Sequence, residues 1–151
     1  MSGRRRVLAV ASGGGHWVQL RRVMPAFDGH DVTYLTIDPT YRHDVPDARV
    51  HVVRDATRWD RLGSVRLALQ VAWVVLRVRP HIVFSTGAAP GLFAIVWGRL
   101  LGARTIWLDS VANIEEVSMS GRMARRWAQL WLTQWPQLAR DGGPEYAGAV
   151  F

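Results

Sequence analysis

The stretch VLAVASGGGH, residues 7–16, places a short apolar run directly before three glycines. Successive apolar residues over 7–11 are typical of a strand buried on both faces of a parallel sheet. The segment 12–15 predicts a tight turn, because glycine adopts backbone angles that other residues avoid. A helix is expected next, over 16–27. Strand, turn and helix in this order are typical of the start of an α/β domain.

The rest of the chain continues this alternation of short apolar runs and helical patterns. Further strands are expected at 31–37, 49–53, 81–85, 105–109 and 130–133, and further helices at 59–78, 92–101 and 121–129. The inner row of the first helix is expected to contain Val18, Leu20 and Met24. No repeat, low-complexity tract or composition shift interrupts the pattern. The sequence therefore predicts one Rossmann-like α/β domain over 1–151, with a mostly parallel sheet and helices on both faces.

The helix expected at 59–78 carries two rows of side chains. The row expected to face the core has apolar residues three or four positions apart: Leu62, Val65, Leu69, Ala72 and Leu76. The adjoining row is Arg66, Gln70, Trp73 and Arg77. A tryptophan among arginines suits a membrane or partner surface, and the alternative is a tryptophan at the edge of the core. Trp97 is expected on the same surface.

Composition limits the classes of function. The chain has 151 residues, is 49% hydrophobic, carries a net charge of +7, and contains no cysteine. Every basic residue is arginine, which excludes P-loop NTPases and Schiff-base enzymes because both need lysine. The positive charge favours anionic partners, although base composition of the genome is an alternative source of the arginines. No apolar run has the length of a membrane span, so a cytoplasmic location is expected.

A second turn of small residues, at 86–90, follows the strand expected at 81–85. Ligands of open α/β sheets bind outside the carboxyl ends of the strands, and helix N-termini at such turns favour phosphate. Both turns are therefore expected at the functional edge. His16 opens the first helix and is a candidate general base, although the glycines alone would explain a plain turn.

Polar residues after the strand expected at 105–109 are further candidates for this edge. Asp109, Asn113, Glu115 and Glu116 suit hydroxyl binding or acid–base chemistry, or else they are solvated loop carboxylates and amides. A basic cluster, Arg122, Arg125 and Arg126, suits phosphate or lipid headgroups, or else a solvated helix face. The histidines show no metal-ligand spacing, so no metal site is expected.

Six motifs occur in an order that is familiar from one family. They are ASGGGH at 11–16 followed by Gln19 and Leu20, STGA at 85–88, LGA at 101–103, WLDS at 107–110, QW at 134–135 and GAVF at 148–151. This set resembles the bacterial capsular and exopolysaccharide biosynthesis proteins that form the acceptor half of a split glycosyltransferase. It is also similar to the membrane-anchoring subunit of the eukaryotic dolichol-linked N-acetylglucosamine transferase.

The resemblance implies an N-terminal GT-B half-domain that binds a polyprenyl-diphosphate-linked sugar acceptor. A separate small subunit would bind the UDP-sugar, so this chain would hold no cofactor and would act as an enzyme only within a complex. The eukaryotic relatives have a membrane span that this sequence lacks. Attachment is therefore expected to be peripheral, on the inner face of the cell membrane, through the row of Arg66, Trp73 and Arg77, the helix at 92–101, or the partner.

The resemblance also implies roles for individual residues. The first diphosphate-facing loop would be Ser12, Gly13, Gly14 and Gly15, and the second would be Thr86, Gly87 and Ala88. His16 would be the general base. Asp109 falls where the family often carries glutamate, and it would contact the acceptor together with Asn113 and Glu115.

Two other functions remain open at this stage. One is a stand-alone Rossmann-type nucleotide-binding domain with Asp38 as the ribose-binding acid. Against it, Val18 stands where the dinucleotide fingerprint has its third glycine. The other is a nucleic-acid binder, which the charge suggests but for which the sequence offers no reading motif.

Overall fold

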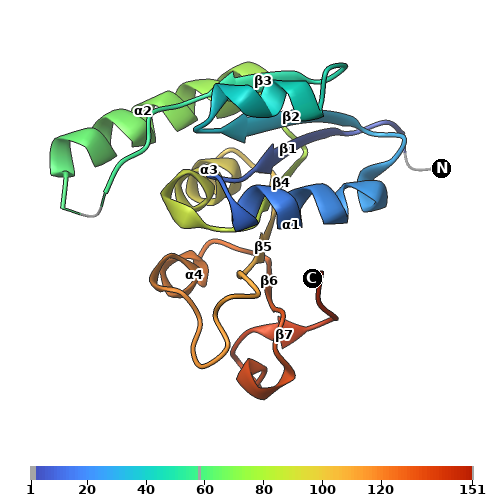
Figure 1. Cartoon of the computed structure of the whole chain (residues 1–151), viewed down its shortest axis with the longest axis vertical. Helices are drawn as coiled ribbons and strands as arrows, with labels where there is room; N and C mark the ends of the chain where they lie inside the picture. The colour runs from blue at the N-terminus through green and yellow to red at the C-terminus, as the bar shows by residue number, and fades with distance from the viewer. Residues whose placement is uncertain (1–2, 58, 151) are drawn as a thin grey trace.

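A single parallel sheet organises the molecule. The computed structural model describes residues 3–57 and 59–150, so the outermost ends of the expected domain and of the GAVF motif lie outside the described residues. Within these ranges seven strands follow the order β3-β2-β1-β4-β5-β6-β7, all parallel (Figure 1). They are β1 (Arg6–Val10), β2 (Asp31–Thr36), β3 (Arg49–Val52), β4 (Ile82–Ser85), β5 (Arg104–Leu108), β6 (Leu130–Thr133) and β7 (Glu145–Tyr146). The expected α/β fold with a parallel sheet is confirmed.

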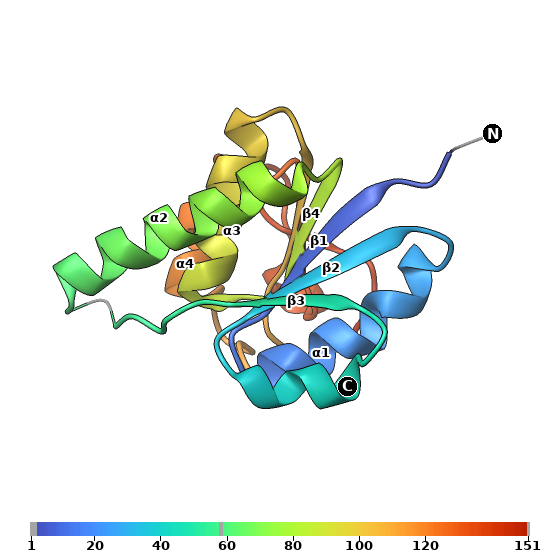
Figure 2. The same cartoon turned by 90° about the horizontal axis from the view of Figure 1, so that it is seen from above.

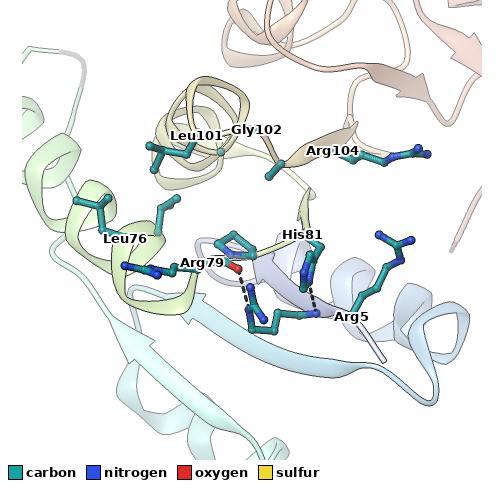
Figure 3. A pocket seen from close by; sticks show the side chains of 12 residues that line it. Arg5, Leu76, Arg79, His81, Leu101, Gly102 and Arg104 are labelled. Atoms are coloured by element: carbon teal, nitrogen blue, oxygen red, sulfur yellow. Dashed lines mark hydrogen bonds between the residues drawn. The ribbon is translucent and has the colours of Figure 1, made fainter. Parts of the chain in front are cut away.

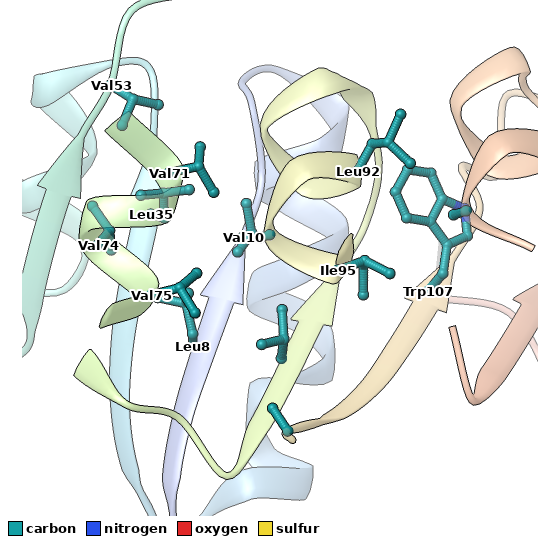
Figure 4. Packing of buried hydrophobic residues seen from close by; sticks show 14 of the residues in the cluster. Leu8, Val10, Leu35, Val53, Val71, Val74, Val75, Leu92, Ile95 and Trp107 are labelled. Atoms are coloured by element: carbon teal, nitrogen blue, oxygen red, sulfur yellow. The ribbon is translucent and has the colours of Figure 1, made fainter. Parts of the chain in front are cut away.

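Helices cover both faces of the sheet (Figure 2). The α-helices are α1 (Gly15–Val23), α2 (Arg61–Val78), α3 (Ala88–Leu100) and α4 (Met119–Ala124), and the 3₁₀ helices are η1 (Met24–Phe27), η2 (Pro39–Asp44) and η3 (Pro136–Leu138). Side chains of α2 and α3 pack with Leu8 and Val10 on one face (Figure 4). Side chains of α1 pack with Ala9 and Ala11 on the other. Because successive residues of a strand point to opposite faces, the apolar run of β1 serves both cores.

The expected core row of α2 is the exposed row of this helix. Leu62 is 64% exposed, Leu69 is 62% exposed, and Val65 and Leu76 are also exposed. The sheet is instead contacted by Leu67, Val71, Val74 and Val75. The prediction was wrong because α2 is apolar on two sides, and periodicity alone cannot say which side meets the sheet.

Three other helices differ in detail from their expected bounds. The first ends at Val23 and continues as a 3₁₀ turn at Pro25, and Val18 is exposed whereas Leu20 and Met24 are buried as expected. Helix α3 begins four residues early because Pro90 is tolerated within a first turn. Helix α4 is shorter and earlier than expected, since Ser118 caps it by accepting a hydrogen bond from the Gly121 N–H. The segment between β2 and β3 contains η2.

Candidate functional site

The two small-residue turns lie at the point where the strand order of the sheet reverses. β1 and β4 are neighbours in the sheet, and from them the chain continues outward in opposite directions, to β2 and to β5. In open α/β sheets this switch point, at the carboxyl ends of the strands, is the usual ligand-binding crevice. The first turn follows β1 and opens α1, and the second follows β4 and opens α3. The structure therefore brings the two turns together, as expected.

The first turn presents backbone N–H groups at the start of α1. Gly14 has a φ of 57°, a left-handed conformation that favours glycine, and its N–H donates to the Tyr41 hydroxyl at 2.8 Å. No side chain caps α1, and no acidic residue occupies its first turn. The positive end of the helix dipole is therefore available to an anion. Ser12 is buried beneath the turn, next to the partly buried Gly13.

The second turn repeats this arrangement at the start of α3. Gly87 has a φ of 136°, and Ala88 has a φ of 66°, an uncommon value for a residue with a Cβ. No side chain caps α3, and its first turn also lacks an acidic residue. Gly91 lies so close to β4 that an added Cβ would collide with the Ser85 hydroxyl. Strained backbone of this kind is often found at functional sites.

His16 and Thr86 join the two turns by a reciprocal pair of hydrogen bonds. The His16 Nδ1 lies 2.9 Å from the Thr86 carbonyl oxygen, and the Thr86 hydroxyl donates to the His16 carbonyl oxygen at 2.7 Å. A carbonyl oxygen only accepts, so Nδ1 carries the proton in this contact. The Nε2 of the neutral ring is then left with its lone pair, as a general base requires.

Gly87 leaves room for the His16 ring to approach Thr86. A Cβ at position 87 would lie 2.7 Å from both Nδ1 and Cε1 of His16, closer than carbon atoms tolerate. The second glycine turn therefore has a role that its sequence did not reveal: it leaves room for the imidazole of the first turn. The positions of His16, Thr86 and Gly87 depend on one another.

Asp109 holds the loop that follows β5. The carboxylate is 2% exposed and accepts four hydrogen bonds: from the Trp107 indole, the Asn113 amide, and the N–H and hydroxyl of Ser118. Both of its oxygens are occupied by the loop 110–118. The expected acceptor contact of Asp109 and Asn113 stays a prediction, and the arrangement gives the carboxylate a positioning role.

Glu115 lies apart from the two turns. It is exposed, and with Glu116 it lines a cavity of about 450 Å³ beside α4. In that region Arg122 pairs with Glu116 at 3.3 Å, whereas Arg125 donates to the Gly142 carbonyl oxygen. Glu115 is therefore not part of the cluster that contains His16, and its expected contact with the acceptor stays a prediction. Arg126 is exposed beyond the end of α4.

Two buried glutamines belong to the site although sequence reasoning gave them no role. Gln19 on α1 donates to the Ser110 hydroxyl at 3.2 Å, and its side-chain oxygen accepts from Gln134. Gln134 also donates to the Asp109 carbonyl oxygen and accepts from the Val150 N–H at 2.8 Å. This network ties α1 to the end of β6. The sequence signal for Gln19 was a polar residue on the inner face of the helix, three positions after His16.

The residues expected on one membrane or partner surface lie in different environments. Arg66, Trp73 and Arg77 are exposed on α2. Trp97 is partly buried against the core, and its indole donates to the Ala68 carbonyl oxygen at 3.0 Å, so it belongs to the contact between α2 and α3. None of the helices in the described part of the chain combines the length and apolarity needed to cross a membrane.

Two other expectations concern ligands. The described residues contain no group of three or more histidines, aspartates and glutamates that could hold a metal ion. Asp38, the expected ribose-binding acid, caps η2: its Oδ1 accepts from the Thr40 N–H at 2.9 Å and from the Thr40 hydroxyl at 2.7 Å. These hydrogen bonds lower the pKa of this exposed carboxyl.

The seven-stranded parallel sheet with its surrounding helices resembles the half-domains of GT-B glycosyltransferases. MurG of Acinetobacter baumannii superposes with a TM-score of 0.76 at 14% identity, over 97% of this chain and 47% of that chain. UDP-GlcNAc 2-epimerase of Neisseria meningitidis gives a TM-score of 0.63 at 10% identity, over 85% of this chain and 40% of that chain.

Sequence comparison points to one kind of relative. The chain is 33% identical over 90 residues to UDP-N-acetylglucosamine transferase subunit ALG14 of Eremothecium gossypii, over 52% of this chain and 40% of that protein. It is 24% identical over 172 aligned positions to the Mus musculus subunit of the same name, over 88% of this chain and 76% of that protein. The match thus spans less than half of the fungal subunit. No protein-family model matches the chain.

Proposed function

We propose that this chain is the acceptor-binding subunit of a two-component glycosyltransferase in polysaccharide biosynthesis. It would hold a polyprenyl-diphosphate-linked sugar at the membrane, and a separate small subunit would bring the UDP-sugar to the same cleft. The likeness to the transferase subunits and the GT-B half-domain fold support this role. The observation that carries it is the reciprocal contact between His16 and Thr86, which unites a base and two anion-suited turns.

The acceptor diphosphate would lie against the two turns. Two uncapped helix N-termini converge there, and neither has an acidic residue in its first turn to compete with phosphate. Backbone N–H groups of Gly13, Gly15 and Ala88 are the donors that we assign to the diphosphate. Those of Gly14 and Gly87 already donate to the hydroxyls of Tyr41 and Ser85 and would hold the two turns in shape. The buried side chains of Ser12 and Thr86 would support these turns from beneath.

His16 would remove the proton of the acceptor hydroxyl through Nε2. As the hydroxyl oxygen forms its bond to the anomeric carbon, the bond from that carbon to the nucleotide diphosphate breaks, and UDP leaves with the bonding electrons. The proton ends on Nε2, and the Thr86 carbonyl oxygen stabilises the resulting imidazolium through Nδ1–H. Asp109 would keep Asn113 and the loop after β5 in place beside this reaction, and Glu115 would contact the acceptor from the loop's far end.

The remaining surfaces would serve attachment. The exposed row of Arg66, Trp73 and Arg77 suits peripheral contact with the inner face of the cell membrane. Arg122, Arg125 and Arg126 near the edge of the sheet suit the partner subunit or lipid phosphate. Any nucleotide-sugar would be held by the partner.

Reconstitution tests the proposal. The chain is expressed alone and together with the products of neighbouring open reading frames, and transfer from labelled UDP-sugars to polyprenyl-diphosphate-linked acceptors is measured. We expect no turnover by the chain alone and transfer when one small partner co-purifies with it. Robust transfer by the isolated chain would refute the split active site.

A stand-alone nucleotide-binding domain is the second candidate, and the strand order favours it. β3-β2-β1-β4-β5-β6 is the order of dinucleotide-binding domains, and Asp38 follows β2 at the position of the ribose-binding acid. Calorimetry of the isolated chain with free nucleotides decides between the candidates. Tight binding without a partner would favour this alternative, in which Asp38 would bind the ribose through Oδ2 because Thr40 donates to Oδ1.

A further inference from the structure

A basic cavity lies at the end of the sheet opposite to the glycine turns. It has a volume of about 450 Å³ and is bordered by the amino ends of β1, β4 and β5 and the carboxyl ends of α2 and α3 (Figure 3). Its charged side chains are Arg5, Arg6, Arg79 and Arg104. The proposed glycosyl transfer uses none of them. We call this feature the amino-edge cavity.

The amino-edge cavity has an excess of positive charge. The described residues that line it include no aspartate or glutamate, and the ion pair between Arg122 and Glu116 lies elsewhere. Two helix carboxyl ends contribute a partial negative charge of about half a unit each. Four guanidinium groups exceed that contribution, so the cavity as a whole attracts anions.

Local contacts hold part of the cavity in shape. The Arg6 Nε donates to the Arg79 carbonyl oxygen at 2.8 Å, which ties β1 to the end of α2. The His81 Nδ1 accepts from the Arg6 N–H at 3.0 Å, so the proton of the neutral ring is on Nε2, which is a donor. Arg79 ends α2 with a φ of 50°, a left-handed conformation in which glycine is the usual residue. Arginine thus occupies a position whose left-handed backbone it disfavours.

An exposed apolar surface continues from the cavity. Leu76 and Leu101 line the cavity and are 58% and 54% exposed. From Leu76 the exposed row of α2 runs through Trp73, Leu69 and Val65 to Leu62. The sequence of α2 contains arginines but no acidic residue. We call this row, with Leu101, the α2 surface.

The arginines of the cavity and the apolar α2 surface together favour one kind of ligand. A soluble phosphate or nucleotide would use the arginines but would leave the α2 surface in water. A phosphate that carries acyl chains uses both, because arginine binds the headgroup while leucine and tryptophan enter the interface. An arginine-rich surface without acidic residues complements an anionic bilayer rather than a neutral one.

We propose that the amino-edge cavity binds the phosphate headgroup of an anionic phospholipid while the α2 surface lies in the membrane interface. The proposal rests on the proposed function only for its membrane setting. It places the lipid contact along α2 and at the end of the sheet remote from His16. The carboxyl edge then remains free for the acceptor and the partner subunit.

Vesicle sedimentation with charge-matched variants tests the cavity. The double variant Arg5→Gln/Arg104→Gln removes two cavity charges whose side chains make no hydrogen bond in the described structure. The control Arg21→Gln/Arg140→Gln removes two exposed charges away from the α2 surface. On equimolar phosphatidylcholine–phosphatidylglycerol vesicles we expect the cavity variant to bind about 25-fold more weakly, since each arginine near the surface contributes about fivefold. An equal loss in the control would show attraction by net charge alone and overturn the proposal.

Two further measurements test the apolar contact and the ligand source. We expect Leu69→Ser to weaken vesicle binding about tenfold, and Ile114→Ser, a matched change at another exposed apolar residue, to leave it unchanged. Equal binding to pure phosphatidylcholine vesicles would overturn the anionic lipid. Calorimetry with glycerol phosphate tests a soluble ligand: tight binding in the cavity combined with no vesicle binding would also overturn it.

The failure of this inference is distinguishable from failure of the proposed function. With a short-chain acceptor in vesicle-free buffer, we expect Arg5→Gln/Arg104→Gln to leave transfer by the reconstituted complex unchanged. We expect His16→Ala to reduce transfer about 10²–10⁴-fold and to leave vesicle binding unchanged. Loss of transfer in the arginine variant under these conditions would place the cavity in the acceptor site instead.

Discussion

The two ends of the parallel strands both favour anions, but they do so by different means. At the carboxyl edge the donors are backbone N–H groups, and His16 is joined to Thr86 by two hydrogen bonds, one from its ring and one to its carbonyl oxygen. At the amino edge the donors are exposed arginines, of which only Arg6 is held by a described hydrogen bond within the cavity. One end has fixed geometry, and the other has mobile charge.

We infer that the two ends have different tasks: the carboxyl edge serves the transfer reaction, and the amino edge serves attachment to the membrane. A proton transfer needs atoms held at hydrogen-bond distance, and glycine turns supply that without side-chain entropy. A fluid bilayer presents headgroups at no fixed position, so long arginine side chains can follow them at little cost. Four experiments test this contrast, beginning with the largest expected effect.

Replacing His16 with alanine tests the fixed end most directly. We expect transfer by the reconstituted complex to fall about 10²–10⁴-fold, because a positioned general base contributes that much. The thermal midpoint should change little, since the ring is only partly buried. The measurement is transfer of labelled sugar at saturating acceptor, with His30→Ala, a histidine away from the turns, as control. Unchanged activity would remove His16 from the mechanism.

Leucine-to-alanine changes on the two sides of α2 test whether its outer surface is free of a folding role. Leu67 is fully buried, so we expect Leu67→Ala to cost about 2–5 kcal/mol of unfolding free energy. Leu62→Ala, on the exposed row, should stay within about 0.5 kcal/mol. Urea denaturation followed by circular dichroism measures both. Similar losses at the two positions would contradict the orientation of α2.

A Cβ at Gly87 tests the close packing of the carboxyl edge. Gly87→Ala would combine a left-handed backbone with a clash against His16, and we expect a cost of about 1–3 kcal/mol together with loss of transfer. Gly148 is the matched control: its φ is 116°, but nothing lies within 4 Å of an added Cβ. Gly148→Ala therefore reports the backbone strain alone. If both variants lose equal stability, the contact with His16 contributes nothing.

The pH dependence of stability tests the arginine charge around β3, outside the amino-edge cavity, and has the smallest expected effect. Partial burial, then Arg77, Arg42 and Arg49, lower the pKa of His51 below its ordinary value of 6.5. Between the lowered pKa and 6.5 the unfolded chain binds more protons than the folded one, so stability falls as the pH drops through this window. His51→Gln should flatten the dependence there. An unaltered slope in denaturation midpoints across pH would mean that His51 titrates normally.

The sequence was most informative where a residue's chemistry and its position in the pattern agreed. Glycine after a buried strand indicated the first turn, and the second turn of small residues followed the same logic. Because parallel strands end at one edge, the sequence could also place the two turns side by side. It could not show that the His16 ring bonds to Thr86, since that depends on how closely α1 and α3 approach.

The sequence was least informative where a segment offered two equivalent choices. Helix α2 is apolar on two sides, and the predicted side was wrong because only the sheet and α3 decide which one is buried. Asp109 posed the same difficulty: as a loop carboxylate it suited a ligand, but folding surrounds it with three donors from its own loop and the Trp107 indole of β5. The roles of Gln19 and Gln134 likewise depend on contacts between distant segments.

The sequence by itself therefore determined the α/β class, the parallel sheet, the glycine turns and the excess of arginine. These follow from local backbone preference, from periodicity and from composition, which are properties of short segments. Only the tertiary structure decided which face of α2 meets water, that Gly87 makes room for His16, and that four arginines gather around one cavity. Those facts depend on packing between elements far apart in the chain, and no local pattern encodes the direction from which a neighbour arrives.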